Sequence, residues 1–181
     1  VWQIKNFSKK KLRYAKLENA DLSGIDLSGA DLQLASMAHA DLRGANLNGA
    51  DLTQANLVTA NLQNASLRGI TLNMVIASGA RLVGADLSGA VLVWADLGYC
   101  DLRGARLDGA NLHNCDLRQA DLDGVSLNDV INLEPKWLTG AVNVPSGYWC
   151  RQRILDYVEV GIPEYYKQRM HLKGRFTVDM P

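Results

Sequence analysis

Histidine and cysteine are the side chains in this sequence that could act as a general base or as a nucleophile. They occupy six positions spread along the chain, which are His39, His113, His171, Cys100, Cys115 and Cys150. Catalysis needs such groups to converge in one cavity with an orienting partner. The cysteine spacing matches neither a zinc motif nor a disulfide framework. We therefore expect no metal, no cofactor and no enzyme activity, with Cys150 as the one candidate for a reactive thiol.

Paired carboxylates are also suited to acid–base chemistry, and Asp121 with Asp123 is such a pair. These two acids flank a leucine, and similar acids recur along the chain without a partnering base. We interpret them as turn and surface residues.

A five-residue period must position all of these side chains. Leucine recurs at every fifth position from Leu12 to Leu127, in 22 of 24 slots, with Met37 and Ala77 as the exceptions. Two residues before each slot, alanine fills 17 of 23 positions. This period fits neither a helix nor a strand, so the chain must turn at every repeat. Four repeats then form a square coil of twenty residues, and about six coils stack into a solenoid through backbone hydrogen bonds about 4.8 Å apart.

The residues around each leucine predict a corner at every repeat. The position two after leucine is glycine or asparagine in more than half of the repeats, and both residues tolerate positive φ. The position before leucine is mostly Asp, Asn, Ser or Thr, which bond to the backbone at turns. The pattern weakens near residues 70–78. Because Ala77 underfills a leucine slot, we expect either that Ile76 turns inward or that a β-bulge is present.

Three repeats carry a resemblance to a known family. Ala20-Asp21-Leu22-Ser23-Gly24, Ala40-Asp41-Leu42-Arg43-Gly44 and Ala50-Asp51-Leu52-Thr53-Gln54 resemble the A(D/N)LXX signature of the pentapeptide-repeat family, and the match covers about two thirds of the chain. The resemblance implies an all-β solenoid, namely a right-handed quadrilateral parallel β-helix filled with leucine and alanine. It implies no single function, because the best understood members resemble DNA and protect gyrase while most have no assigned role. The family's abundance in cyanobacteria suggests, by analogy, a photosynthetic or thylakoid-associated complex.

Large apolar residues gather along one edge of the expected solenoid. Two walls have glycine corners, whereas a third has the corner residues Tyr14, Leu34, Gln54, Met74, Trp94 and Asn114. An exposed apolar patch with Trp and Tyr is typical of a protein-binding surface. We predict a partner-binding surface of nine residues: Tyr14, Leu34, Val58, Met74, Ile76, Val91, Val93, Trp94 and Tyr99. Coverage by the C-terminal tail and scattered surface residues are the alternatives.

The two ends differ from the middle. The period stops near residue 130, so we expect a solenoid over 1–130 and a separate segment over 131–181, which holds seven of the twelve aromatic residues. Ser146 begins a predicted helix to about residue 160, and a second is predicted over about 163–173. We expect these helices to cap the solenoid, with homodimerisation through them as an alternative.

Basic residues cluster at the start of the chain, at Lys5, Lys9, Lys10, Lys11, Arg13 and Lys16. Charge protects the exposed edge of a first coil from unwanted pairing. Contact with an acidic partner or an anionic membrane surface is the alternative. The sequence has no run of about 18 apolar residues, so no transmembrane helix is predicted. We expect a cytoplasmic protein, or one peripheral to a membrane complex.

The balance of charge limits the function classes. The chain has 19 basic and 19 acidic residues, which is not the footprint of a nucleic-acid-binding protein. Between Lys5 and Asp129, 14 acids and 12 bases leave only −2, whereas imitating DNA needs dense negative charge. We predict a non-enzymatic interaction or assembly module that binds another protein or complex through its apolar edge. A DNA mimic that binds a topoisomerase is the alternative.

Overall fold

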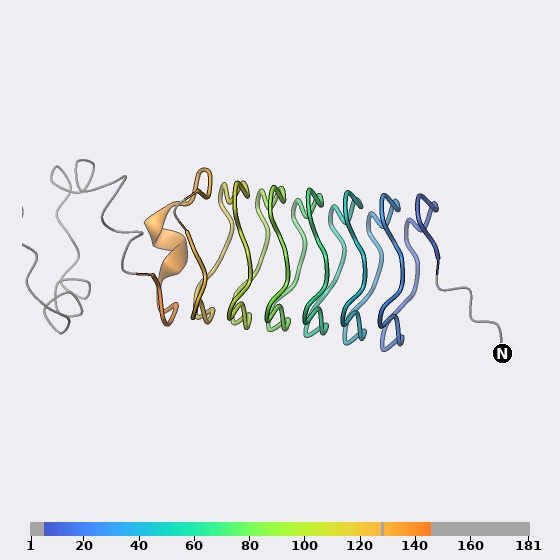
Figure 1. Ribbon diagram of the computed structural model, residues 1–181, viewed down its shortest axis with the longest axis horizontal. Helices are drawn as coiled ribbons and strands as arrows, with labels where there is room; N and C mark the ends of the chain where they lie inside the picture. Colours follow the sequence, from blue (N-terminus) through green and yellow to red (C-terminus); the bar gives the residue numbers. More distant parts are fainter. Residues whose placement is uncertain (1–5, 128, 146–181) are drawn as a thin grey trace, which may run out of the picture. The chain divides into compact units, whose positions relative to one another are not determined.

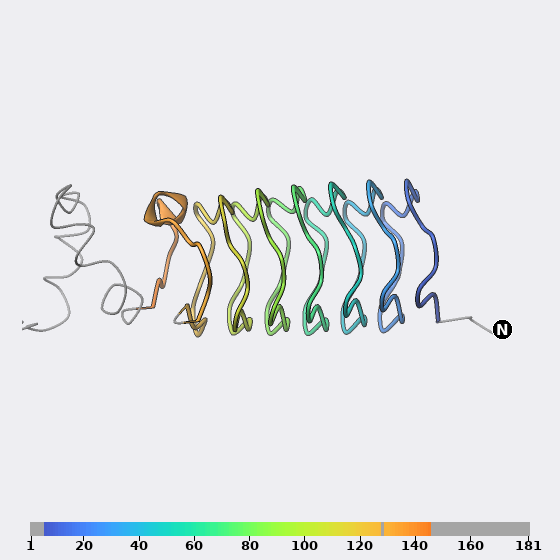
Figure 2. The same cartoon turned by 90° about the horizontal axis from the view of Figure 1, so that it is seen from above.

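The computed structural model describes residues 6–127 and 129–145, all within the first of two compact units, Val1–Pro145. In this unit the backbone winds into successive coils that stack along a single axis (Figure 1). The view turned by 90° shows the same coils with their corners in register (Figure 2). The all-β solenoid predicted from the sequence is confirmed.

Parallel β-bridges join each coil to the next at a constant offset of twenty residues. Asp21 pairs with Asp41, Asp41 with Asn61, and Asn61 with Arg81. The Leu42 amide donates to Asn61 O at 2.7 Å, and the Asp41 amide donates in the other direction to Ala20 O at 2.9 Å. Side chains twenty positions apart therefore lie next to one another, at the strand spacing of about 4.8 Å.

We name the four walls of the solenoid by their first leucine, as the Leu12, Leu17, Leu22 and Leu27 walls. The Leu17 wall is centred on Leu17, Met37, Leu57, Ala77, Leu97 and Leu117. The opposite Leu27 wall is centred on Leu27, Leu47, Leu67, Leu87, Leu107 and Leu127.

Each leucine is followed by a tight turn. In the repeat of Leu42, the Ala45 amide donates to Leu42 O at 3.0 Å, and Gly44 has a φ of +63°. A positive φ at the third residue is the geometry of a type II turn. The Arg43 amide within the turn donates to Asp41 Oδ1 at 3.1 Å. The carboxylate or amide before leucine thus caps the turn, which explains why Asp and Asn recur there.

Leucine and alanine fill the interior. The repeat leucines from Leu27 to Leu127 are at most 4% exposed, and Cys100 and Cys115 are buried in two of the alanine slots. Within the described residues, every buried side chain in this core is apolar. The interior therefore offers no polar site to a ligand.

The structure contradicts both expectations for the irregular repeat near Ala77. Ile76 points outward and is 49% exposed, so it does not fill the leucine slot. The twenty-residue register continues without a bulge, because Ile76 pairs with Asn56 on one side and Asp96 on the other. Part of the missing side-chain volume remains as a void of about 10 Å³ beside Ala77 and Leu97. The regular ladder is retained at the expense of tight packing.

The ladder continues beyond the last regular repeat. Ile131 pairs with Asn111, and Val142 pairs with Asp121. Between them lies η1, a short 3-10 helix over Pro135–Leu138, in which Pro135 and Leu138 are buried. The helices predicted over residues 146–160 and 163–173 lie outside the described residues. Among those described, no helix is long and apolar enough to cross a membrane.

Candidate protein-interaction surface

The apolar edge is the column of corner residues that joins the Leu12 wall to the Leu17 wall. It consists of Tyr14, Leu34, Gln54, Met74, Trp94 and Asn114. The backbone register places these residues in successive coils, and Gln54 Nε2 lies 3.7 Å from Met74 Sδ. Exposure is 65% for Tyr14, 49% for Met74 and 57% for Trp94. Large side chains therefore project from this edge into solvent.

The backbone of the apolar edge is strained in a way that a glycine corner is not. Tyr14, Leu34, Met74 and Trp94 all have φ between 53° and 60°. This left-handed conformation costs an L-residue roughly 1–2 kcal/mol, whereas glycine adopts it freely. On the Leu27 wall the equivalent corner positions are Gly29, Gly49, Gly69, Gly89 and Gly109. The large side chains are thus kept at positions where glycine is the more stable choice.

A second local rule is broken at the same edge, in the positions that normally cap the turns. Ile76 and Val91 stand where most repeats have Asp, Asn, Ser or Thr, and neither side chain can accept a hydrogen bond. Lys11, Lys16, Arg81 and Arg106 also lack an acceptor at this position, but they are polar. Beside Val91, the Val93 amide instead donates to Asn73 Oδ1 of the preceding coil at 3.3 Å. Positions that break local rules without an evident gain in stability are often functional.

The structure brings together only part of the nine-residue surface predicted from sequence. Met74, Ile76, Val91, Val93 and Trp94 lie in two successive coils around one corner. Val58 faces outward on the Leu17 wall, and Tyr99 lies at the far corner of that wall with 72% exposure.

Tyr14 lies four coil spacings from Trp94, or about 19 Å. Leu34 and Gln54 separate Tyr14 from Met74 in this column. The guanidinium carbon of Arg13 lies 5.8 Å from the centre of the Tyr14 ring. The compact part of the surface is therefore centred on Trp94, and Tyr14 marks its distant end.

Sequence reasoning missed one contributor to this surface. The His113 ring meets Trp94 edge to face, with 6.4 Å between the ring centroids and an interplanar angle of 78°. His113 follows the next leucine of the Leu12 wall, twenty residues after Val93. Comparing residues twenty positions apart would have placed it beside Trp94.

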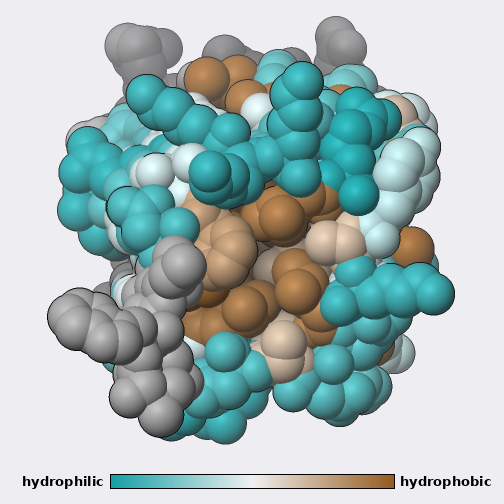
Figure 3. All heavy atoms as spheres, turned by 90° about the vertical axis from the view of Figure 1, so that its right-hand side faces the viewer, coloured by the Kyte–Doolittle hydropathy of each residue, from teal (hydrophilic) through white to brown (hydrophobic). Residues whose placement is uncertain are grey.

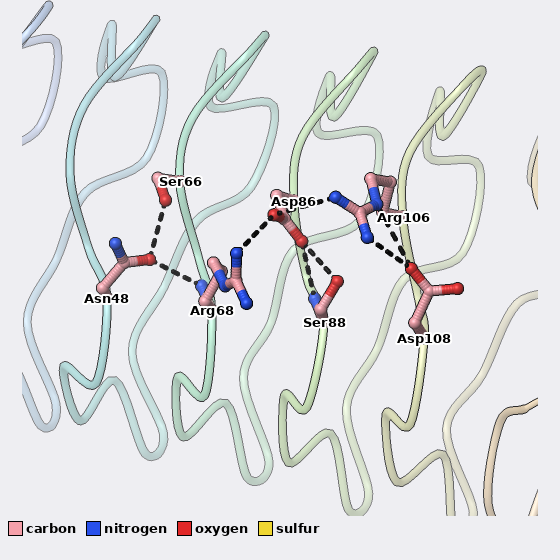
Figure 4. Close-up of polar contacts among 7 residues, drawn as sticks. All are labelled: Asn48, Ser66, Arg68, Asp86, Ser88, Arg106 and Asp108. Carbon is pink, nitrogen blue, oxygen red and sulfur yellow. Dashed lines mark hydrogen bonds and ion pairs between the residues drawn. The ribbon is translucent and has the colours of Figure 1, made fainter.

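The opposite Leu27 wall is polar and satisfies its own hydrogen bonds (Figure 4). Asn48 Oδ1 accepts hydrogen bonds from Ser66 Oγ and the Arg68 amide, both at 2.8 Å. Further along the wall, Arg106 lies 3.6 Å from Asp86 and 2.9 Å from Asp108. This wall presents groups that already have partners within the chain.

The surroundings of Asp86 on the Leu27 wall lower the pKa of its carboxyl group. Burial raises the pKa of Asp86, but hydrogen bonds from Ser88 and the charges of Arg106 and Arg68 together outweigh it, so the pKa lies below its ordinary value. Asp86 is therefore a stable carboxylate rather than a proton donor near neutral pH.

Within the described part of the chain, the groups suited to catalysis do not converge. His39 Nδ1 lies 2.5 Å from Thr59 Oγ1 at one corner, whereas His113 lies on the Leu12 wall. Burial raises the pKa of Cys100 to about 12, and burial also raises the pKa of Cys115. Throughout residues 6–127 and 129–145, no three His, Cys, Asp or Glu side chains are grouped to hold a metal ion. The predicted thiol Cys150 and His171 lie outside the described residues.

The predicted basic cluster forms the rim of the first coil, apart from Lys5, which is not described. The end-on view shows apolar side chains at the centre of the coil and hydrophilic ones around it (Figure 3). Leu12, Leu17 and Leu22 are only partly buried, unlike the leucines of later coils. The rim carries Lys9, Lys10, Lys11, Arg13 and Lys16.

The pattern described as pentapeptide repeats (8 copies) matches residues 11–49, 35–73, 55–92, 72–98 and 90–129. The chain has no match among curated proteins.

The solved structures that match this chain come from several biological settings. A trypsin-treated form of QnrB1, a plasmid-mediated fluoroquinolone resistance protein, is 28% identical with a TM-score of 0.43; the alignment covers 70% of this chain and 64% of QnrB1. HetL, involved in heterocyst differentiation regulation in the cyanobacterium Nostoc sp. PCC 7120, is 35% identical, covering 75% of this chain and 73% of HetL, with a TM-score of 0.25. A thylakoid lumen protein of Arabidopsis thaliana is 32% identical, covering 62% and 72%, with a TM-score of 0.31.

This chain thus spans just under two thirds of the QnrB1 form. Repeats matching the family pattern cover residues 11–129, well over half of the sequence. The predicted stacking of repeats, the leucine and alanine core and the repeated turns are all present in the structure. The protein belongs to the pentapeptide repeat family.

Proposed function

We propose that this protein is a non-enzymatic interaction and assembly module whose working surface is the apolar edge around Trp94. The module is a regular, apolar-filled solenoid in the described residues, and its exposed apolar side chains gather at the Met74 and Trp94 corner. Large exposed aromatic and sulfur-containing side chains are the residues that anchor protein interfaces. A surface of this kind acts by contact and needs no cofactor.

The backbone strain at this corner is the observation that carries the proposal. Met74 has a φ of 53° and Trp94 a φ of 59°, where glycine would relieve the strain and remove the exposed apolar area together. Stability alone therefore favours glycine at both positions. A binding role explains why large side chains are retained there.

Imitation of DNA is less well supported, because many acids of the solenoid are neutralised within their own turns. Arg43 pairs with Asp41, Arg103 with Asp101 at 2.8 Å, and Arg118 with Asp116. A DNA mimic must leave its negative charges available to a basic partner. The acids of this solenoid do not form such an array.

An accessory role in a larger complex is part of the same proposal, and a photosynthetic or thylakoid-associated complex is one such setting. The basic rim at Lys9, Lys10 and Lys11 would then serve as a second contact, for an acidic protein or an anionic membrane surface. The contact at the basic rim follows from its charge, and the photosynthetic setting follows from analogy. Salt screens charge, so it should weaken binding at the rim but not at the apolar edge.

The test is affinity capture with the tagged full chain, followed by mass spectrometry. We expect the wild type to retain a specific protein that the double variant Trp94→Gly, Met74→Gly loses. Both substitutions suit the local backbone, so circular dichroism and thermal unfolding should show an intact solenoid. Asn64→Gly is the matched control, because Asn64 has the same backbone conformation, with φ 56°, in a column of glycines. Retention of the same protein by the double variant would show that the edge is not the binding surface.

A further inference from the structure

The Leu17 wall, flanked by the apolar edge, has charges that reverse from one end to the other. Its bridge positions read Lys16, Ser36, Asn56, Ile76, Asp96 and Asp116 from the first coil onward. The positions after the central slot read Glu18, Ala38, Val58, Ser78, Gly98 and Arg118. The first column, formed by the bridge positions, changes from basic Lys16 to acidic Asp116. The second column, formed by the positions after the central slot, changes from acidic Glu18 to basic Arg118.

Reversed charges of this kind make the wall complementary to itself. A two-fold axis across the wall, between the coils of Asn56 and Ile76, turns a second copy end over end. Such an axis reverses the order of the coils but leaves each column at the same place across the wall. Each column of one copy therefore faces the same column of the other copy, running in the opposite direction. Lys16 then lies opposite Asp116 of the other copy, and Glu18 lies opposite Arg118. Within each copy Asp116 already pairs with Arg118, so the facing side chains form a network of four charges at each end of the interface. Each contact occurs twice in the pair.

Contact in this arrangement is made along the two columns of corner residues that border the wall. The middle of the second column carries Ala38, Val58, Ser78 and Gly98, which face one another between the raised corners. Trp94 at the edge faces Leu34 of the other copy, and Met74 faces Gln54. At the other corner, Tyr99 faces His39. Because each corner faces a corner of the other copy, these exposed side chains carry the contact across the two-fold axis.

Charge distribution along the whole solenoid favours the antiparallel pair over a parallel one. Residues 6–25 contain five bases and two acids, a net charge of +3. Residues 86–125 contain seven acids and three bases, a net charge of −4. A parallel pair brings like ends together, whereas an antiparallel pair sets each end against its opposite.

We propose that a second copy of this chain is the partner of the apolar edge, packed antiparallel along the Leu17 wall. This inference rests on the proposed function of the edge and names its occupant. The wall from Lys16 to Asp116 spans five coil spacings, or about 24 Å. An interface of that length is small, so association should depend on protein concentration in the range used for solution measurements.

The test is sedimentation velocity of the full chain over a range of concentrations, for wild type and charge variants. Lys16→Glu and Asp116→Lys alone each place like charges together twice per dimer and should weaken association roughly tenfold or more. The double variant restores opposite charges across the axis and should recover wild-type association. Basic residues occupy the bridge position at Arg81 and Arg106, but Asp116 caps its turn and pairs with Arg118. Thermal unfolding should therefore first show that Asp116→Lys keeps the solenoid.

Three results would overturn the proposal. The wild type could remain a monomer at all concentrations, or its dimer could be insensitive both to these charges and to Trp94→Gly. Rescue of Lys16→Glu by Glu18→Lys but not by Asp116→Lys would indicate a parallel pair. If the chain is monomeric but the Trp94→Gly, Met74→Gly variant still loses a captured protein, the proposed function stands and only this inference fails.

Discussion

The Leu17 and Leu27 walls lie on opposite sides of the same solenoid, with the same register and the same kind of turn. The Leu27 wall has glycine at its corners and polar side chains that bond to one another, such as Asp86 with Arg106 at 3.6 Å. The Leu17 wall has large side chains at strained corners, Ile76 in a capping position and a void behind Ala77. The same backbone can therefore carry one wall that favours stability and another that favours contact.

The largest expected difference between the two walls concerns the leucine slots. Leu87 is buried at 1% exposure on the Leu27 wall, and Leu87→Ala should lower the free energy of unfolding by about 3 kcal/mol. On the Leu17 wall, Ala77→Leu fills the existing void and should raise it by about 1 kcal/mol. Urea unfolding followed by circular dichroism measures both. A loss of stability in Ala77→Leu would mean that the coil cannot accept leucine there.

The next difference concerns the corners. Gly89 has a φ of +68° and no atom within 4 Å of an added Cβ, so Gly89→Trp should cost about 1–2 kcal/mol through backbone strain alone. Trp94→Gly removes the same strain but loses the contact with His113, so stability should be unchanged or higher by up to about 1 kcal/mol. Thermal unfolding of the two variants shows whether each substitution raises or lowers stability. If Trp94→Gly is clearly destabilised, packing rather than binding explains the tryptophan.

A smaller difference is expected at the capping positions. Asp86 Oδ1 accepts a hydrogen bond from the Ser88 amide at 3.0 Å, and Asp86→Ala should cost about 1 kcal/mol. Ile76→Asn supplies an acceptor for the Ser78 amide, as Asn56 does for Val58 at 3.0 Å, and should stabilise by about 0.5 kcal/mol. Denaturant midpoints measure both changes. The same Ile76→Asn variant should bind its partner less well, and unchanged binding would remove Ile76 from the surface.

The smallest expected effect is the response to acid. The folded-state pKa of Asp86 lies below the ordinary value of 3.8, so its contribution to stability is present above that value and is lost as pH falls through the folded pKa. Asp116 on the Leu17 wall behaves alike, because the bonds from Arg118 outweigh the burial that raises its pKa. Melting temperatures at decreasing pH should fall less steeply in Asp86→Asn and in Asp116→Asn than in wild type. An unchanged slope in both would assign the acid response to other carboxylates.

Much of this fold follows from the sequence because one backbone requirement repeats at every fifth residue. The leucine slots, the alanine slots and the corners were predictable, and so was the exposure of Met74 and Trp94. Less predictable was the outcome at Ile76, where the ladder of main-chain hydrogen bonds overrides the preference for a filled leucine slot. The pairing of Val142 with Asp121 was also not predictable, because no repeat leads to it.

The candidate site was predictable in membership but not in arrangement. A period of twenty places Trp94 and Met74 in one column, yet the left-handed φ of both depends on a turn that their residue types do not favour. The side-chain contact between His113 and Trp94 depends on rotamers, which repeat spacing does not specify. The boundary expected at residue 130 and the helices expected after Ser146 remain predictions.

The constant offset of twenty residues also determines how this protein can change length. An insertion of twenty residues adds one coil and leaves every later side chain facing in its former direction. An insertion of five residues keeps each leucine inside but moves every later residue on by one wall. If the insertion lies between Tyr14 and Trp94, these two residues no longer share a column. An insertion of one residue turns the buried leucines outward. Lineages of such proteins should therefore differ by deletions and duplications in multiples of five, and those that share a binding edge by multiples of twenty.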